Sequence, residues 1–265
     1  MNRRIFLSSG MLAACSLIGV PPAHAQIANI NDAINKSGRQ RMLSQRMAKA
    51  YLQLGQAIDV ERSKKVLEQS VSLFDQQLTE LKAFSPMPEN KTALLEMSLA
   101  WSSYKGVLTG TMPNPRDART VLTLNEEILV VAQASTVQLE KHSGSAIGRF
   151  VNMSGRQRML SQRMAKFYQA INWGIATPDA HDKLLDARKE FVAAMAQLCE
   201  SQRNTPEIVR ALELAQMQWV FFDNAIGVSA AGSHNRAQLA TNVATTSERI
   251  LEVMEQITGM YEKLG

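Results

Sequence analysis

The sequence predicts an all-α protein built as two tandem up-down four-helix bundles related by an internal duplication. Helix-breaking residues recur at regular intervals, and between them apolar residues are spaced three and four apart, without the alternation typical of strands. The thirteen residues SGRQRMLSQRMAK occur twice without a change, starting at Ser37 and again at Ser154. We call this segment the box. The halves also share an aromatic pair three residues apart, Trp101 with Tyr104 and Trp219 with Phe222.

The first 25 residues predict a cleaved export signal. Arg3 and Arg4 precede an apolar stretch over 5–20, and Ala-His-Ala at 23–25 forms a small-x-small cleavage site before Gln26. The run Arg-Arg-Ile-Phe-Leu resembles a twin-arginine signal, which we slightly favour over general export. A lipid on Cys15, within Leu-Ala-Ala-Cys, is the weaker alternative, because the apolar stretch continues past it and a cleavage site follows.

The chain after residue 25 has the properties of a soluble periplasmic protein. Its length allows one or two well-buried domains. Loss of two arginines lowers the net charge from +5 to +3, which gives no reason to expect nucleic acid. Cys199 is then the only cysteine, so no disulfide can form within the chain. No later stretch approaches the roughly 18 apolar residues of a membrane helix.

Helix-ending residues define four helices in each half. The first unit, 26–143, contains expected helices over 27–57, 60–84, 89–110 and 115–141, which end near Gly55, Pro86, Gly110 and Gly144. The second unit, 144–265, contains expected helices over 145–174, 178–202, 206–229 and 234–263. Asn114, Thr177 and Thr205 each precede a proline, which predicts a capping side chain followed by proline at the first helical position. A break is expected at Ala230-Ala231-Gly232.

The order of these helices predicts how the two boxes meet. After four antiparallel helices the fifth runs parallel to the first. The two box helices can then lie side by side, related by a pseudo-twofold axis. At about 100° per residue, Arg41 and Arg158 lie on faces that are otherwise apolar or small, whereas the other four box arginines point more than a right angle away. Those four are Arg39, Arg46, Arg156 and Arg163.

An arginine on an apolar face needs an anion, because a buried unpaired charge is very costly. Acids of other helices, such as Glu126 or Glu127 together with Glu248, would neutralise Arg41 and Arg158 in the simplest interpretation. We favour a shared pocket for a small anion, because two identical helices each bring one arginine and keep a glycine that costs about 1 kcal/mol in a helix. The expected ligand-binding residues are Arg41, Arg158, Gly38, Gly155, Ser37, Ser154, Ser44 and Ser161.

The box resembles two related families of sensory domains. The pattern Asn-x-x-Gly-x-x-Arg-Met-x-Ser-x-Arg, which begins at Asn35 and Asn152, resembles the ligand-box helix of NarX-like nitrate and nitrite sensors. The segment GRQRMLSQRMAK resembles the PilJ-type N-terminal domain of chemoreceptors linked to type IV pili. In the nitrate sensors, an arginine from each of two paired subunits holds one nitrate. The resemblance implies that Arg41 and Arg158 take this role, with duplication building the pocket within one chain.

The resemblance also implies a function without catalysis. Membrane sensors of this kind continue into transmembrane helices and a kinase or methyl-accepting module, so we expect output through a separate membrane sensor or transporter partner. A ligand-free helical module that works with pilus, chemoreceptor or transporter components is the alternative. The sequence predicts no catalytic residue, no metal site and no cofactor, and the frequent methionines are expected to fill the core. It does not give the oligomeric state.

Overall fold

The computed structural model describes residues 26–228 and 235–265, and this part of the chain is folded into helices without strands. The helices are α1 (Ile30–Gly55), α2 (Val60–Phe84), α3 (Pro88–Gly110), α4 (Pro115–Ser143), α5 (Ala146–Trp173), α6 (Ala180–Cys199), α7 (Pro206–Gly227) and α8 (Arg236–Glu262). None of them combines the length and the apolar character needed to cross a membrane. The expected export signal and the expected break at 230–232 lie outside the described residues.

The expected all-α class is confirmed, and two of the three proline-marked helix starts are confirmed with it. Asn114 accepts hydrogen bonds from the backbone N–H groups of Arg116 and Asp117, and Thr205 accepts one from Ile208. The expected start at Pro178 is wrong by two residues. The Thr177 hydroxyl donates to the Asp179 carboxylate (2.6 Å) instead of capping a helix, and α6 begins only at Ala180.

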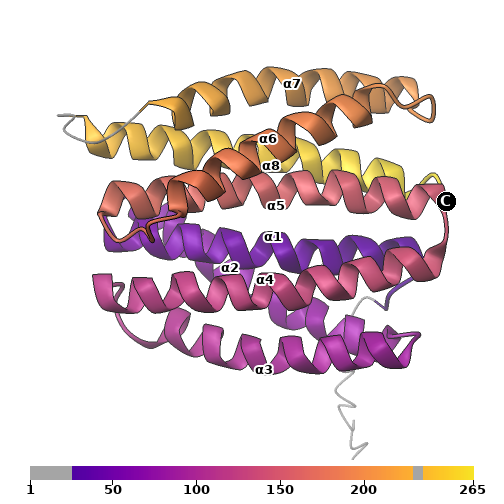
Figure 1. Ribbon diagram of the computed structural model, residues 1–265, viewed down its shortest axis with the longest axis horizontal. Coiled ribbons are helices and arrows are strands. Elements are labelled where there is room, and N and C mark those ends of the chain that lie inside the picture. Colours follow the sequence, from indigo (N-terminus) through magenta and orange to yellow (C-terminus); the bar gives the residue numbers. More distant parts are fainter. Residues whose placement is uncertain (1–25, 229–234) are drawn as a thin grey trace, which may run out of the picture.

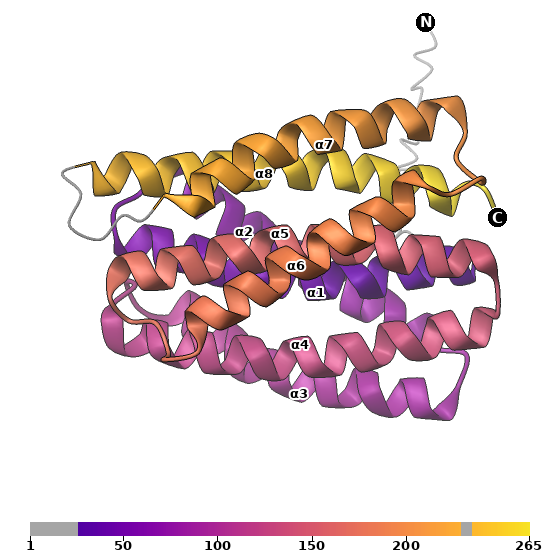
Figure 2. The same cartoon turned by 45° about the horizontal axis from the view of Figure 1, so that its top comes forward.

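The two box helices, α1 and α5, form the centre of the molecule. They run side by side and parallel, with α3 and α4 on one side and α7 and α8 on the other (Figures 1 and 2). In each half the box helix packs between the second and fourth helices, and the third helix packs chiefly against the fourth. Both box helices are therefore buried on most of their circumference.

The carboxyl ends of α1 and α5 fix their parallel register. A Cβ atom at Gly55 would lie 2.0 Å from Cη2 of Trp173, so only glycine lets the indole pack there. The Gln56 amide, just after α1, donates to the backbone carbonyl of Gln169 (3.1 Å) and accepts from the Asn172 amide (2.8 Å). Gly55 therefore ends α1 as expected, and its main role is to allow close contact with α5.

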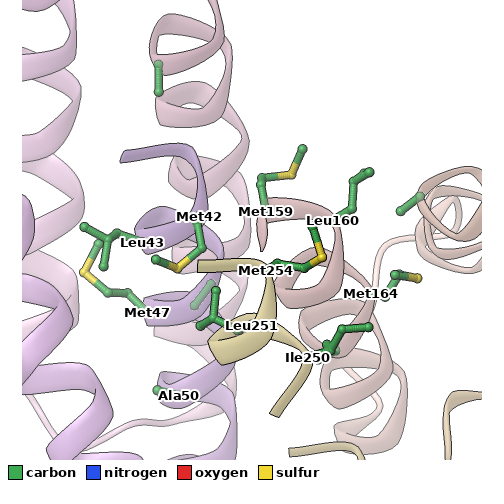
Figure 3. Close-up of a cluster of buried hydrophobic side chains, with 14 of the residues drawn as sticks. Met42, Leu43, Met47, Ala50, Met159, Leu160, Met164, Ile250, Leu251 and Met254 are labelled. Atoms are coloured by element: carbon green, nitrogen blue, oxygen red, sulfur yellow. The ribbon is translucent and has the colours of Figure 1, made fainter. Parts of the chain in front are cut away.

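The core repeats the duplication seen in the sequence. Phe74 stacks on Trp101 with ring centroids 4.1 Å apart, and Phe191 stacks on Trp219 at 4.4 Å. The box methionines are buried, as expected for core filler, and Figure 3 shows them with Leu251 and Met254 of α8. The two aromatic pairs thus make equivalent contacts in the two halves.

Candidate functional site

Arg41 and Arg158 are the largest fully buried side chains in the described part of the chain, each with 0% exposure. The side chains of Arg39, Arg46, Arg156 and Arg163 are 18%, 20%, 33% and 15% exposed. The helical phase of the box therefore predicted which arginine of each three turns inward. A guanidinium without contact to solvent must be stabilised by hydrogen-bond acceptors or anions around it.

Each buried arginine crosses from one box helix to the other. Nη2 of Arg41 on α1 donates to Oδ1 of Asn152 on α5 (2.7 Å), and Nη2 of Arg158 donates to Oδ1 of Asn35 (2.8 Å). The two asparagines occupy equivalent positions in the two box helices. Their amide nitrogens donate in turn to carboxylates near the ends of α4 and α8, those of Glu140 for Asn152 and Glu262 for Asn35.

The remaining partners of the two arginines differ. Nη1 of Arg158 forms an ion pair with Glu255 on α8, at 2.6 Å. Nη1 of Arg41 donates to the side-chain carbonyl of Gln133 on α4, also at 2.6 Å. Within the described residues Arg41 has only amide oxygens as side-chain partners. The simplest interpretation, that acids of other helices neutralise these arginines, therefore holds for Arg158, through Glu255. It does not hold for Arg41, and the named candidates Glu126, Glu127 and Glu248 bond neither arginine in the described residues.

Glu126 and Glu248 instead hold the other basic residues of the two boxes. Glu248 on α8 pairs with Arg46 and Lys49 of α1, and Glu126 on α4 pairs with Arg163 and Lys166 of α5. Each acid therefore belongs to one half and binds the box helix of the other. Burial lowers the pKa of Lys49 to about 8 and that of Lys166 to about 7, although the neighbouring glutamates oppose this shift.

These ion pairs should make the protein sensitive to acid. Burial alone would raise the pKa of Glu126, Glu248 and Glu255, but the paired cations lower each from its ordinary 4.5 to about 2. A carboxyl group whose pKa is lower in the folded state adds stability above its unfolded pKa and loses it as the pH falls. We expect the unfolding midpoint to fall steeply from pH 5 to pH 2, as measured by circular dichroism. A flat profile over this range would contradict the assignment of these ion pairs.

The two glycines of the expected site lie beside the guanidinium groups. A Cβ atom on Gly38 would lie 3.0 Å from Nη2 of Arg41 and 3.7 Å from Nη2 of Arg158. A Cβ atom on Gly155 would lie 2.9 Å from Nη2 of Arg158. The space that the sequence assigned to a ligand or a neighbouring helix is thus occupied at least in part by the arginines themselves, and both of them reach Gly38.

The four serines of the expected site lie against helix backbone or α4. The Ser37 hydroxyl bonds those of Ser135 and Thr136 on α4, at 3.1 and 3.0 Å. The other three donate to carbonyls of their own helix, Ser44 to Arg41, Ser161 to Arg158 and Ser154 to Phe150. These serines place small side chains around the arginines. Each hydroxyl proton is already donated to an acceptor within the protein.

The two buried guanidiniums retain hydrogen-bonding capacity. Nε of Arg41 and Nε of Arg158 are buried and have no acceptor among the described residues. Burial, followed by the charges of Arg156 and Arg158, lowers the pKa of Arg41 to about 9, so it remains protonated at neutral pH. Burial also lowers the pKa of Arg158, and Glu255 opposes that change. Such a site supplies donors and positive charge for a planar oxyanion.

The sequence did not single out Asn35, Asn152, Gln133 or Glu255 as site residues. The two asparagines stand in the family pattern, and that position was the available signal for them. Gln133 and Glu255 each lie seven residues after the acids that had been considered, Glu126 and Glu248. Seven residues are two helical turns, so these positions share a face with the expected acids.

The comparisons with known proteins agree with the duplication. The model of the PilJ family, described as the N-terminal domain of type IV pili methyl-accepting chemotaxis transducers, matches residues 23–123 and 141–246. These two matches together cover most of the chain, and each includes one copy of the box. No curated protein and no solved structure matched the chain. The chain therefore belongs to the PilJ family of chemotaxis transducer N-terminal domains, a family of signalling domains, and carries two copies in tandem.

Proposed function

We propose that this protein is a periplasmic sensory protein that binds one small planar anion between its two box helices. Nitrate and nitrite are the favoured ligands, by resemblance to NarX-like sensors. The main support is the pair Arg41 and Arg158, two fully buried guanidiniums on parallel helices, each with an Nε atom that lacks a partner in the described structure. In this proposal residues 1–25 are a cleaved export signal, and 26–143 and 144–265 are the two sensory units.

Ligand binding would act on the distance between α1 and α5. Each arginine is anchored on one box helix and bonded to an asparagine of the other, so an anion held by both stabilises the arrangement in which the helices are close. A ligand shifts an equilibrium by its difference in affinity for two states. The signal would pass to a separate membrane sensor or transporter that contacts the bundle surface.

Thermal unfolding in the presence of different anions tests this proposal. Residues 26–265 are heated with nitrate, nitrite, chloride, sulfate or acetate at matched ionic strength. A ligand at one hundred times its Kd should add about 2.7 kcal/mol of stability if it binds only the folded protein. We expect nitrate or nitrite to raise the midpoint selectively. Equal midpoints with all five anions would reject the anion sensor.

The outer face of α7 favours an interaction module as the second candidate. Leu214, Met217 and Phe221 follow one another at intervals of three and four residues and are 39%, 56% and 59% exposed. A stripe of this kind on a helix surface is typical of a face that contacts another protein. If no anion binds, this face becomes the leading functional surface, and substitutions there should remove partner binding.

A further inference from the structure

The side-chain partners of the two buried arginines match between the halves except at one position. Arg41, Asn152 and Glu140 correspond to Arg158, Asn35 and Glu262, with the same atoms bonded in each case. The exception is the residue that bonds Nη1 of the buried arginine, which is Gln133 on α4 and Glu255 on α8. This difference changes the charge of the site without changing its shape.

In the second half the protein supplies an anion of its own. One carboxylate oxygen of Glu255 accepts from Arg158 at 2.6 Å, and the other accepts from Arg39 of the opposite box helix. A planar monoanion with two oxygens thus bridges a buried and a half-buried guanidinium. Both arginines at this position therefore contact a carboxylate of the chain itself.

In the first half the equivalent place is held by a neutral group. The side-chain oxygen of Gln133 accepts from Arg41 at 2.6 Å and from Arg156 of the opposite box helix at 2.9 Å. Arg156 also pairs with Glu190 on α6, whereas Arg41 has no carboxylate at ion-pair distance among the described residues. The fully buried Arg41 guanidinium therefore has no carboxylate in direct contact, and those of Glu140 and Glu190 act on it only from a longer distance.

A cleft leads from the surface to this position. It lies between α4, α5 and α6, has a volume of about 460 Å³, and is lined by Gln133 and Arg156. Its walls carry the basic side chains of Arg156, Arg163 and Lys183 and the acidic side chains of Glu126, Asp186 and Glu190, so their formal charges balance. Since Gln133 lines the cleft and bonds Arg41, movement of one partly buried amide connects the cleft with the buried guanidinium.

We propose that Gln133 determines the ligand class of the site, because it leaves the buried Arg41 guanidinium without a carboxylate in contact, a place that one monovalent planar oxyanion can take. The anion enters through the cleft between α4, α5 and α6 and replaces the Gln133 amide oxygen on Arg41 and Arg156, beside Arg158. The Glu255 carboxylate shows in the other half that such a group fits between two guanidiniums. This inference rests on the proposed anion-binding function and assigns its charge selectivity.

Two single substitutions, which give each half the residue type of the other, test the proposal. Isothermal titration of residues 26–265 with nitrate, nitrite, formate and sulfate at matched ionic strength is carried out on the unaltered chain, Gln133→Glu and Glu255→Gln. We expect the unaltered chain to bind one monovalent anion, and Gln133→Glu to lower that affinity at least tenfold. Glu255→Gln should leave Arg158 without a carboxylate in contact as well, and improve sulfate binding at least tenfold relative to nitrate.

The control variant is Gln216→Glu, which adds the same charge at an exposed position of α7. Gln133→Glu should also raise the unfolding midpoint without ligand, because its carboxylate would bridge Arg41 and Arg156 as Glu255 bridges the equivalent pair. Anion binding by Gln133→Glu equal to that of Gln216→Glu would overturn the charge assignment and leave the sensory function intact. Absence of anion binding by the unaltered chain and by Glu255→Gln would overturn both.

Discussion

Replacement of Glu248 by alanine is expected to destabilise the protein by about 3–5 kcal/mol, the usual cost of removing one partner of a buried ion pair. Lys49 is 1% exposed, and its ammonium group donates to Glu248 at 2.5 Å. The same carboxylate also accepts from Arg46. Without Glu248 the buried Lys49 amine keeps only the neutral Ser247 hydroxyl as a partner, and burial disfavours its charged form. Chemical denaturation followed by circular dichroism measures the loss.

Two other substitutions serve as a control and as a comparison for the loss of stability in Glu248→Ala. Glu252→Ala changes an exposed acid on the same helix and should alter stability by no more than about 0.5 kcal/mol. Glu126→Ala removes the equivalent acid on α4, whose side chain is 32% exposed compared with 6% for Glu248, so its loss should be smaller. A cost below 1 kcal/mol for Glu248→Ala would show that water or another acid neutralises Lys49.

These ion pairs give a structural reason for the identity of two of the thirteen box positions. Arg46 and Lys49 of the first box bind α8, the last helix of the second half, and Arg163 and Lys166 of the second box bind α4 of the first half. Each box thus contacts both its own half and the other. A change in one copy would break the symmetry of contacts at the centre, whereas the outer helices meet different neighbours and can differ.

The sequence was sufficient for the helices, the duplication and the inward direction of Arg41 and Arg158. These properties depend on local periodicity and on the 100° turn per residue. The residues that bond the arginines could not be predicted with the same certainty. Glu126 and Gln133 lie on one face of α4 two turns apart, and only the axial offset between packed helices decides which of them reaches Arg41. That offset depends on loops and on contacts such as Gly55 with Trp173.

The glycines also show how far the site can be predicted from the sequence. Their position inside a helix correctly indicated a close approach, because Gly38 and Gly155 lie against guanidinium groups. The sequence does not give the identity of the approaching group, since a ligand, a neighbouring helix and a side chain of the same helix leave the same signal. Here the Arg41 side chain folds back over the glycine three residues before it.

Replacement of Arg41 or Arg158 by alanine should each lower nitrate affinity at least tenfold, and the double replacement should add little. Nη2 of both arginines approaches Gly38, so one anion can contact both. Arg41→Ala removes the buried guanidinium that has no carboxylate in contact. In Arg158→Ala the Glu255 carboxylate keeps only Arg39 as its ion-pair partner and repels an incoming anion. Residues that act on one ligand as a unit give coupled, non-additive losses.

Titration calorimetry on both single variants and the double variant measures the coupling, with Arg119→Ala, an exposed arginine on α4, as the control for loss of charge. Far-ultraviolet circular dichroism and the unfolding midpoint show whether each variant remains folded. If the two losses add, each arginine serves a site of its own, and the box helices bind two anions independently. If they couple, the duplication has placed within one chain a single site that needs both box helices.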